Sequence, residues 1–129
     1  MNIKDFAEQY IKNWREALLN GKVQNFEALF DPNFAYHASG QDLNLKAYMQ
    51  HIVYLRTNSK ILEIDVKYVV SDRNIFVLSF KGRYNFMSDI PGLPPVIGKE
   101  LTAYDLCVLR IENSKVIEGW SNTRFVITD

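Results

Sequence analysis

Alternating apolar and polar positions dominate the last third of the chain and predict two long β-strands joined by a turn. Residues 101–111 and 116–126 both follow this period of two, with many of the aromatic and β-branched residues that strands favour. Residues 112–115 lie between them, and Asn113 tolerates the left-handed backbone that a hairpin turn requires. On both strands each face mixes large apolar residues with a few polar ones. A sheet with one solvated face has a cleaner polar side, so this mixture indicates the wall of a cavity.

The polar residues of this hairpin fall among apolar neighbours. Asp105 shares a face with Cys107 in the first strand, and in the second Asn122 and Arg124 share a face with Trp120. A carboxylate in such a place must be paired, protonated or in contact with water. If both faces are concave, Asp105 and Arg124 meet as an ion pair. That pair is either structural or an anchor for a carbonyl or carboxylate ligand.

Three stretches in the first half of the chain have the three- and four-residue spacing of amphipathic helices. The clearest covers residues 2–20, with Asn2 as its N-terminal cap and Gly21 at its end. Two more helices are predicted over 23–30 and 45–58.

Tyr10 and Trp14 lie on the apolar stripe of the first helix, and each carries a polar group on its ring. Such residues either pack in the core or line a ligand pocket. Both alternatives stay open, and we take the two as candidate substrate-binding residues.

Shorter patterns connect the helices to the terminal hairpin. Residues 34–37 form a short predicted strand, followed by a loop over 39–42. After the third helix, alternation predicts strands over 62–70 and 75–86, joined by a turn at 71–74. The chain is therefore predicted to run helix, helix, short strand, helix, and then four long strands in consecutive hairpins.

Helices followed by antiparallel strands indicate the α+β class. We expect a single domain over residues 1–129, with N-terminal helices packed on one face of a curved, mostly antiparallel sheet. A strongly twisted sheet around a long helix leaves a conical hollow, where small ligands usually bind. The loop over 88–95 contains three prolines and joins two long strands. It either caps the mouth of the cavity or covers a sheet edge.

Charge and composition exclude several classes of function. Fifteen Lys and Arg residues balance fifteen Asp and Glu residues without a basic stripe, which argues against a nucleic-acid partner. The N-terminus lacks an apolar signal core and no apolar run approaches the length of a membrane span. We therefore expect a cytoplasmic protein without membrane contact. The lone Cys107 forms no internal disulfide.

His37 is the best candidate acid or base, because a histidine titrates near neutral pH. The alternative is a histidine that bonds a backbone carbonyl at a strand end. His51, on the third predicted helix, is interpreted as a surface or packing residue. Two distant histidines without paired cysteines make no metal site, and no glycine-rich loop opens a helix. We expect neither a metal nor a cofactor.

Several segments also carry a family resemblance. They are LFDPNFAYH at 29–37, GKE at 98–100, RI at 110–111 and KVIEGW at 115–120. With the order of elements, they resemble the SnoaL-like polyketide cyclases of the nuclear-transport-factor-2-like superfamily, which also includes ketosteroid isomerase. The resemblance implies a cone-shaped α+β domain and a homodimer paired through the outer sheet face. It implies a function among isomerases, cyclases, dehydratases and proteins without catalysis.

The working residues of these relatives are not present as such. SnoaL-like cyclases usually place an acid–base aspartate four residues after the motif's tryptophan. That position is Arg124 here, and an arginine stays protonated and cannot accept a proton. In the comparison with ketosteroid isomerase, the tyrosine of the first helix falls near Trp14 and the protonated aspartate near Cys107. The base aspartate of that enzyme falls at or beside Ala38.

These observations predict a pocket for a small hydrophobic molecule, with His37 and Asp105 as candidate catalytic residues. The candidate substrate-binding residues are Tyr10, Trp14, Trp120, Asn122 and Arg124. In the leading hypothesis, a cofactor-independent cyclase or isomerase, His37 moves a proton beside a carbonyl. Arg124, Asp105 and Asn122 then orient the substrate. The alternatives are a non-catalytic binding domain, favoured by the loss of the family's aspartate, and a dimeric interaction module.

Overall fold

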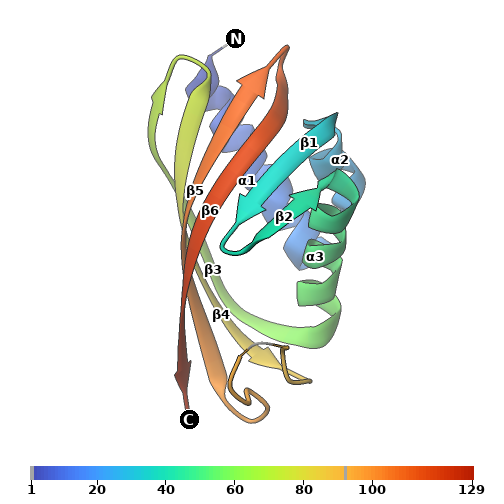
Figure 1. Ribbon diagram of the computed structural model, residues 1–129, viewed down its shortest axis with the longest axis vertical. Helices are drawn as coiled ribbons and strands as arrows, with labels where there is room; N and C mark the ends of the chain where they lie inside the picture. The colour runs from blue at the N-terminus through green and yellow to red at the C-terminus, as the bar shows by residue number, and fades with distance from the viewer. Residues whose placement is uncertain (1, 92) are drawn as a thin grey trace.

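The computed structural model describes residues 2–91 and 93–129 and folds them into an α+β domain of three helices and six strands. In chain order these are α1 (Ile3–Asn20), α2 (Val23–Glu27), β1 (Phe30–Ala38), β2 (Gln41–Asn44), α3 (Leu45–Asn58), β3 (Ser59–Asp72), β4 (Ile75–Phe86), β5 (Glu100–Glu112) and β6 (Lys115–Thr128). The strands form one sheet in the order β2-β1-β6-β5-β4-β3, with a single parallel pair between β1 and β6. The sheet curves around the helices, as Figure 1 shows. The predicted fold class is confirmed.

The ends of α1 follow the predicted signals. The Asn2 side chain accepts hydrogen bonds from the backbone N–H groups of Lys4 (3.0 Å) and Asp5 (3.2 Å). Gly21 ends the helix with φ +74° and donates its N–H to the Ala17 carbonyl. These caps fix where α1 begins and ends.

The segment between α1 and α3 differs from its prediction. The second helix ends at Glu27, and β1 begins at Phe30, where it pairs with Val116 of β6. The predicted loop over 39–42 includes part of β2, because Ala38 pairs with Gln41 across a tight turn in which Gly40 has φ +74°. The short, polar β2 has no apolar alternation, so its sequence alone did not predict a strand.

Strand β5 has the alternation that its sequence predicts. Leu101, Cys107 and Leu109 are buried on the concave side, whereas Tyr104 and Leu106 are exposed on the other. In β6 the alternation breaks once. Ile111 pairs with Val116 but Arg110 pairs with Glu118, so Ile117 is an extra, bulged residue. Because of this bulge, Val116 and Gly119 both face the interior.

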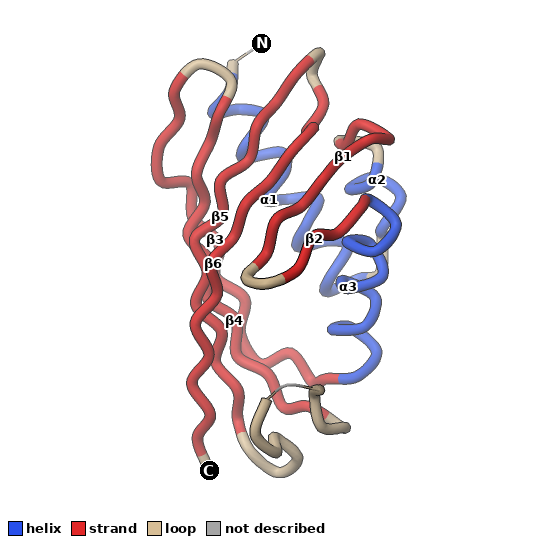
Figure 2. Tube along the Cα trace, in the orientation of Figure 1, coloured by secondary structure: helices blue, strands red, loops and turns tan. Residues whose placement is uncertain are grey.

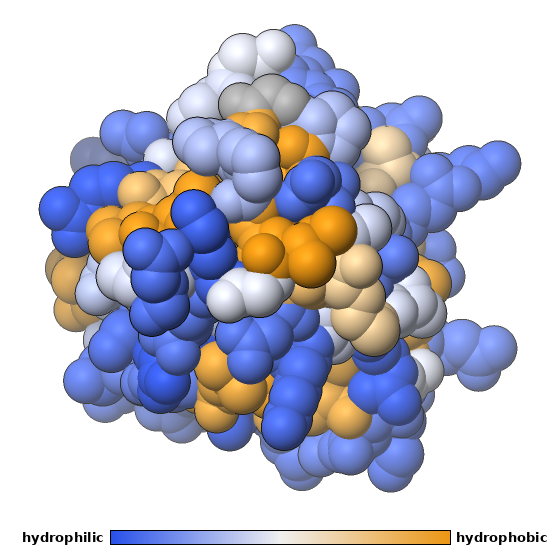
Figure 3. All heavy atoms as spheres, turned by 90° about the horizontal axis from the view of Figure 1, so that it is seen from below, coloured by the Kyte–Doolittle hydropathy of each residue, from blue (hydrophilic) through white to orange (hydrophobic). Residues whose placement is uncertain are grey.

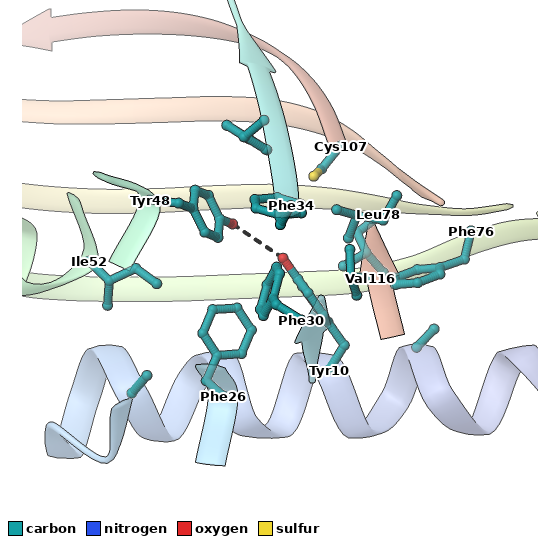
Figure 4. Packing of buried hydrophobic residues seen from close by; sticks show 14 of the residues in the cluster. Tyr10, Phe26, Phe30, Phe34, Tyr48, Ile52, Phe76, Leu78, Cys107 and Val116 are labelled. Carbon is teal, nitrogen blue, oxygen red and sulfur yellow. Dashed lines mark hydrogen bonds between the residues drawn. The ribbon is translucent and has the colours of Figure 1, made fainter. Parts of the chain in front are cut away.

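Aromatic side chains fill one end of the interior. Figure 4 shows rings from α1, α2, β1 and α3 packed together, with the hydroxyl of Tyr10 directed at that of Tyr48. The two oxygens are 3.2 Å apart. Phe26 is fully buried, and its ring centroid lies 5.0 Å from that of Tyr10 and 4.9 Å from that of Phe30. Toward the other end, β3 and β4 curve toward the C-terminal end of α3 (Figure 2).

Candidate functional site

A cavity of about 520 Å³ lies between the helices and the concave face of the sheet. Its described lining comes from α1, α3, all six strands and the loop after β4. Ile90, Pro91 and Leu93 of that loop line the cavity, so the first of the two predicted roles, capping the mouth, fits this segment. The loop is held together by the Asp89 carboxylate, which accepts hydrogen bonds from the backbone N–H groups of Val96 (2.9 Å) and Ile97 (3.3 Å). The loop lies at the lower end of the molecule in Figure 1. Figure 3 shows that end from below, with hydrophobic side chains gathered between hydrophilic ones.

Small residues on the sheet make room for the aromatic walls of the cavity. A Cβ atom at Gly119 would lie 2.9 Å from Cδ1 of Tyr36 and 2.8 Å from Cδ2 of Leu109. A Cβ atom at Gly82 would lie 2.7 Å from Cζ of Tyr84, because the tyrosine ring leans back over the glycine. These are closer than van der Waals contact, so both positions depend on the missing side chain.

Asp105 is the only acidic residue among the described residues that line the cavity. Its Oδ1 atom is buried and has no hydrogen-bond partner. Burial raises the pKa of the carboxyl group to about 6, and the Thr123 hydroxyl and the backbone at Asn122 and Leu106 oppose this rise. A carboxyl group with this pKa can both accept and return a proton near neutral pH, which is what general acid–base catalysis needs.

Phenol groups share the cavity with this carboxyl group. Tyr10, Tyr36, Tyr48 and Tyr84 all line the cavity, and burial raises the pKa of each phenol above its ordinary value. The ring centroids of Tyr36 and Tyr48 are 4.6 Å apart. Phenols that stay protonated are hydrogen-bond donors, and such donors stabilise negative charge that develops on a substrate oxygen.

Cys107 and His51 also line the cavity and stay uncharged near neutral pH. Burial raises the pKa of the Cys107 thiol to about 12, so this cysteine is not a nucleophile. His51 is partly open to solvent, but its imidazole also borders the cavity. Desolvation there lowers the pKa of the imidazole. His51 therefore belongs to the cavity lining, which its position on a predicted helix did not indicate.

The structure brings only some of the sequence-predicted site residues together. Tyr10, Trp14 and Asp105 line the cavity, and the indole of Trp14 meets the ring of Phe80 edge to face at 5.2 Å. His37, Trp120, Asn122 and Arg124 lie outside this lining.

Strand register explains why the predicted residues of β6 are outside. Asp105 pairs directly with Thr123, and Tyr104 pairs with Arg124. Directly paired residues share a face of the sheet, so Thr123 faces the cavity and Arg124 the outer surface. The guanidinium of Arg124 stacks over the Tyr104 ring, 4.8 Å from its centroid. The predicted ion pair between Asp105 and Arg124 is therefore not formed.

His37 is held by carboxylates on the outer surface. Its Nδ1 lies 2.9 Å from Asp42 and its Nε2 lies 2.7 Å from Glu118, which in turn accepts a 2.8 Å hydrogen bond from Arg110. Asp42 first, and then Glu118, raise the pKa of the imidazole. With both ring nitrogens engaged outside the cavity, His37 has no free nitrogen directed at a ligand there.

The outer face of the sheet also carries exposed apolar residues. Leu106 is 53% exposed, Trp120 lies diagonally opposite it on β6, and Val126 is exposed further along β6 on the same face. Exposed apolar residues on this face are the feature that the interaction-module alternative requires. The homodimer remains a prediction.

Tyr84 is a cavity residue that sequence reasoning missed. Its side chain is almost fully buried, and the Asp105 carboxylate contributes to the rise in its pKa. The sequence contains a signal for this position, which is the glycine at position 82. Gly82 pairs with Ala103 in the adjacent strand, and Ala103 is two residues from Asp105 on the same face of β5. A glycine two residues before a tyrosine marks the space into which the ring leans.

We expect Gly82→Ala to destabilise the protein by about 1–3 kcal/mol, because the new methyl group overlaps the Tyr84 ring. Urea unfolding of Gly82→Ala, Tyr84→Ala and the double variant measures this. In the Tyr84→Ala background the added methyl group should cost much less, giving a coupling free energy of about 1 kcal/mol or more. Additive losses in the double variant contradict the proposed contact.

Within residues 2–91 and 93–129 there is no group of three or more His, Cys, Asp and Glu side chains able to hold a metal ion. In the same ranges, no helix has the length and apolarity needed to cross a membrane.

The sequence of residues 8–123 matches the family model of the SnoaL-like polyketide cyclases. The match spans most of the chain, so this protein belongs to the SnoaL-like polyketide cyclase family. Its helices packed on a curved sheet form the nuclear-transport-factor-2-like fold of that family.

Several solved structures share this fold. A SnoaL-like polyketide cyclase from Agrobacterium tumefaciens is similar with a TM-score of 0.73 at 16% identity, over 92% of this chain and 91% of that chain. A protein provisionally named a polyketide cyclase from Silicibacter sp. has a TM-score of 0.71 at 12% identity, over 92% and 88%. A provisionally named isomerase from Rhodopseudomonas palustris has a TM-score of 0.66 at 7% identity, over 92% and 88%. Identities this low show a shared fold and not a shared reaction. No curated protein matches this chain in sequence.

Proposed function

We propose that this protein transfers a proton beside a carbonyl group of a small, largely apolar substrate, as cyclases and isomerases do, without a cofactor. The observation that carries the proposal is the Asp105 carboxyl group in the cavity, with an unpartnered Oδ1 and a pKa of about 6. A titratable group that has a buried oxygen without a hydrogen-bond partner, in an apolar cavity, is uncommon where its role is purely structural.

Asp105 is the base in this proposal, in place of His37. The ionised carboxylate takes a proton from the carbon next to the carbonyl. The electron pair of the broken C–H bond forms a carbon–carbon double bond, and the carbonyl π electrons move onto oxygen to give an enolate. In a cyclase the enolate carbon attacks a second carbonyl carbon, the π electrons of that carbonyl move onto its oxygen, and this oxygen takes the proton from Asp105. In an isomerase the substrate carries a carbon–carbon double bond next to the carbon that loses the proton, so a dienolate forms, and the far carbon of that double bond takes the proton back from Asp105.

The phenols supply the second requirement of this chemistry, which is a donor for the enolate oxygen. Burial is the main cause of the raised pKa values of Tyr84 and Tyr48, and the charge of Asp105 adds to both. All three side chains line the same cavity. A neutral phenol donates a hydrogen bond without bringing a charge, and in a water-poor cavity this stabilises the enolate strongly.

Deuterium exchange of 2-tetralone, a small apolar ketone with acidic protons beside its carbonyl, tests the proposal. We expect the protein in deuterated water to accelerate the loss of these proton signals in NMR spectra. The rate should rise with pH, reach half of its maximum near pH 6 as Asp105 ionises, and level off above this.

His37→Ala is the matched control, because His37 contacts Asp42 and Glu118 outside the cavity. This variant should exchange 2-tetralone within about twofold of the rate of the unchanged protein. No acceleration for 2-tetralone and other ketones of similar size, or loss of exchange in His37→Ala, contradicts the proposed role of Asp105.

A further inference from the structure

Asp105 brings a negative charge into the cavity, and the walls supply no positive one. Neither lysine nor arginine occurs among the described lining residues. Arg124 and Lys81 both pair with Tyr104, the residue before Asp105, and therefore lie on the opposite face of the sheet, where Arg124 stacks on the Tyr104 ring. An apolar site that holds one unpaired charge favours an occupant of the opposite sign.

The other titratable groups of the lining leave this charge uncompensated. His51 is the one basic side chain in the described lining, and desolvation lowers the pKa of its imidazole, which keeps it neutral. Burial raises the pKa of the Tyr10, Tyr36, Tyr48 and Tyr84 phenols and of the Cys107 thiol, so these groups stay protonated. Near neutral pH, Asp105 is therefore the group that sets the charge of the cavity.

Aromatic rings form much of the wall around this carboxylate. Nine of the described lining side chains are Phe, Tyr or Trp, so a ligand in the cavity lies near several rings. Phe80 is the cross-strand neighbour of Asp105, and the indole of Trp14 packs against Phe80. The electron-rich faces of such rings attract cations, most of all where water is excluded.

We infer that the ligand of this cavity is an organic cation, with an ammonium group beside Asp105 and an apolar, ring-containing body along the aromatic wall. The inference rests on the proposed function in taking the cavity as the ligand site, but it does not require Asp105 to transfer a proton. An anionic ligand meets repulsion from the carboxylate, and the described lining has no lysine or arginine to receive it. A neutral ketone can still give a proton to Asp105, but it does not pair the charge of the carboxylate.

Three naphthalene probes of similar shape and different charge test this inference. They are trimethyl(naphthalen-2-ylmethyl)ammonium, naphthalen-2-ylmethanol and naphthalene-2-acetate. Their affinities are measured by calorimetry at pH 8 for the unchanged protein and for Asp105→Asn. We expect the substitution to weaken the ammonium probe by about tenfold or more, change the alcohol by less than about twofold and strengthen the acetate.

The pH dependence provides a second readout. The quaternary nitrogen keeps its charge at every pH, so any change comes from the protein. Lowering the pH from 8 to 4.5 protonates Asp105, and the affinity of the unchanged protein for the ammonium probe should fall toward that of Asp105→Asn. In Asp105→Asn the affinity should stay nearly constant over the same range.

Asp72→Asn is the matched control, because Asp72 is exposed at the β3–β4 turn and outside the cavity lining. It changes the net charge as Asp105→Asn does, and should leave all three affinities unchanged.

The inference is overturned if Asp105→Asn does not weaken the ammonium probe, if Asp72→Asn weakens it equally, or if the unchanged protein binds only the alcohol. In that last case the proposed function stands. Binding of none of the probes overturns the inference and the ligand site together, and a cation preference without exchange of 2-tetralone removes the proposed function alone.

Discussion

Replacing Asp105 with asparagine is expected to abolish proton exchange and, at pH 8, to make the protein more stable. Asparagine has nearly the shape of aspartate but cannot accept the proton. We therefore expect the exchange rate of 2-tetralone to fall by about 100- to 10,000-fold, the usual contribution of a positioned general base. This loss should appear in the rate at saturating ketone rather than in the ketone's affinity.

The gain in stability follows from the direction of the pKa shift. The carboxyl group of Asp105 has a pKa of about 6 when folded, against an ordinary value of 3.8. Between these values the folded state binds more protons than the unfolded state, so the free energy of unfolding falls as the pH rises through this range. At pH 8 the buried charge costs about 2–3 kcal/mol, and asparagine removes that cost. Below pH 4 both side chains are neutral and the two proteins should be equally stable.

Urea unfolding at pH 8 and at pH 3.5 measures this difference. Asp72→Asn serves again as the control, since an exposed aspartate carries no such cost and its substitution should change stability by less than about 0.5 kcal/mol. If Asp105→Asn is less stable than the unchanged protein at pH 8, the carboxylate contributes to folding and the argument for a functional charge fails. A group that weakens the fold and is needed for turnover is typical of an active site.

Much of the fold could be predicted because its signals are local. The helix caps at Asn2 and Gly21 and the alternation of β5 each depend on neighbouring residues in the chain, and all three are present as predicted. Asp105 faces the cavity for the same reason, since its face was set by the buried residues on either side of it in β5.

The second strand of the hairpin shows what the sequence does not contain. Val116 is fully buried, and uninterrupted alternation from Val116 would turn Trp120, Asn122 and Arg124 inward. The bulged Ile117 shifts the phase by one residue, so these side chains face outward instead. Because a bulge depends on the pairing with β5, the pattern of β6 alone cannot place its faces.

His37 is a different kind of error, because a local signal was available. Tyr36 is buried on β1 and Ala38 lines the cavity, and a residue between two inward positions of a strand points outward. Asp42 and Glu118, which hold His37, come from separate strands. A histidine that titrates near neutral pH is therefore a candidate base only where the strand turns it toward the cavity.

The division of the interior into a filled end and a hollow end predicts a large difference between two identical substitutions. Phe26 is fully buried among the rings of Tyr10 and Phe30, and Phe26→Ala should destabilise the protein by about 3–5 kcal/mol. Phe125 lines the cavity and is 46% exposed, so Phe125→Ala should cost less than about 1 kcal/mol, because little packing is lost.

Urea unfolding of both variants measures the two costs under the same conditions. The comparison is controlled internally, since the same atoms are deleted at each site and only their surroundings differ. Similar losses at the two positions mean that the cavity end is packed as tightly as the aromatic end in solution. In that case the space for a ligand beside Asp105 does not exist, and both the proton transfer and the cation site lose their basis. A large loss at Phe26 with a small one at Phe125 means that the rigid aromatic end supports the fold while the hollow end stays free to hold a ligand.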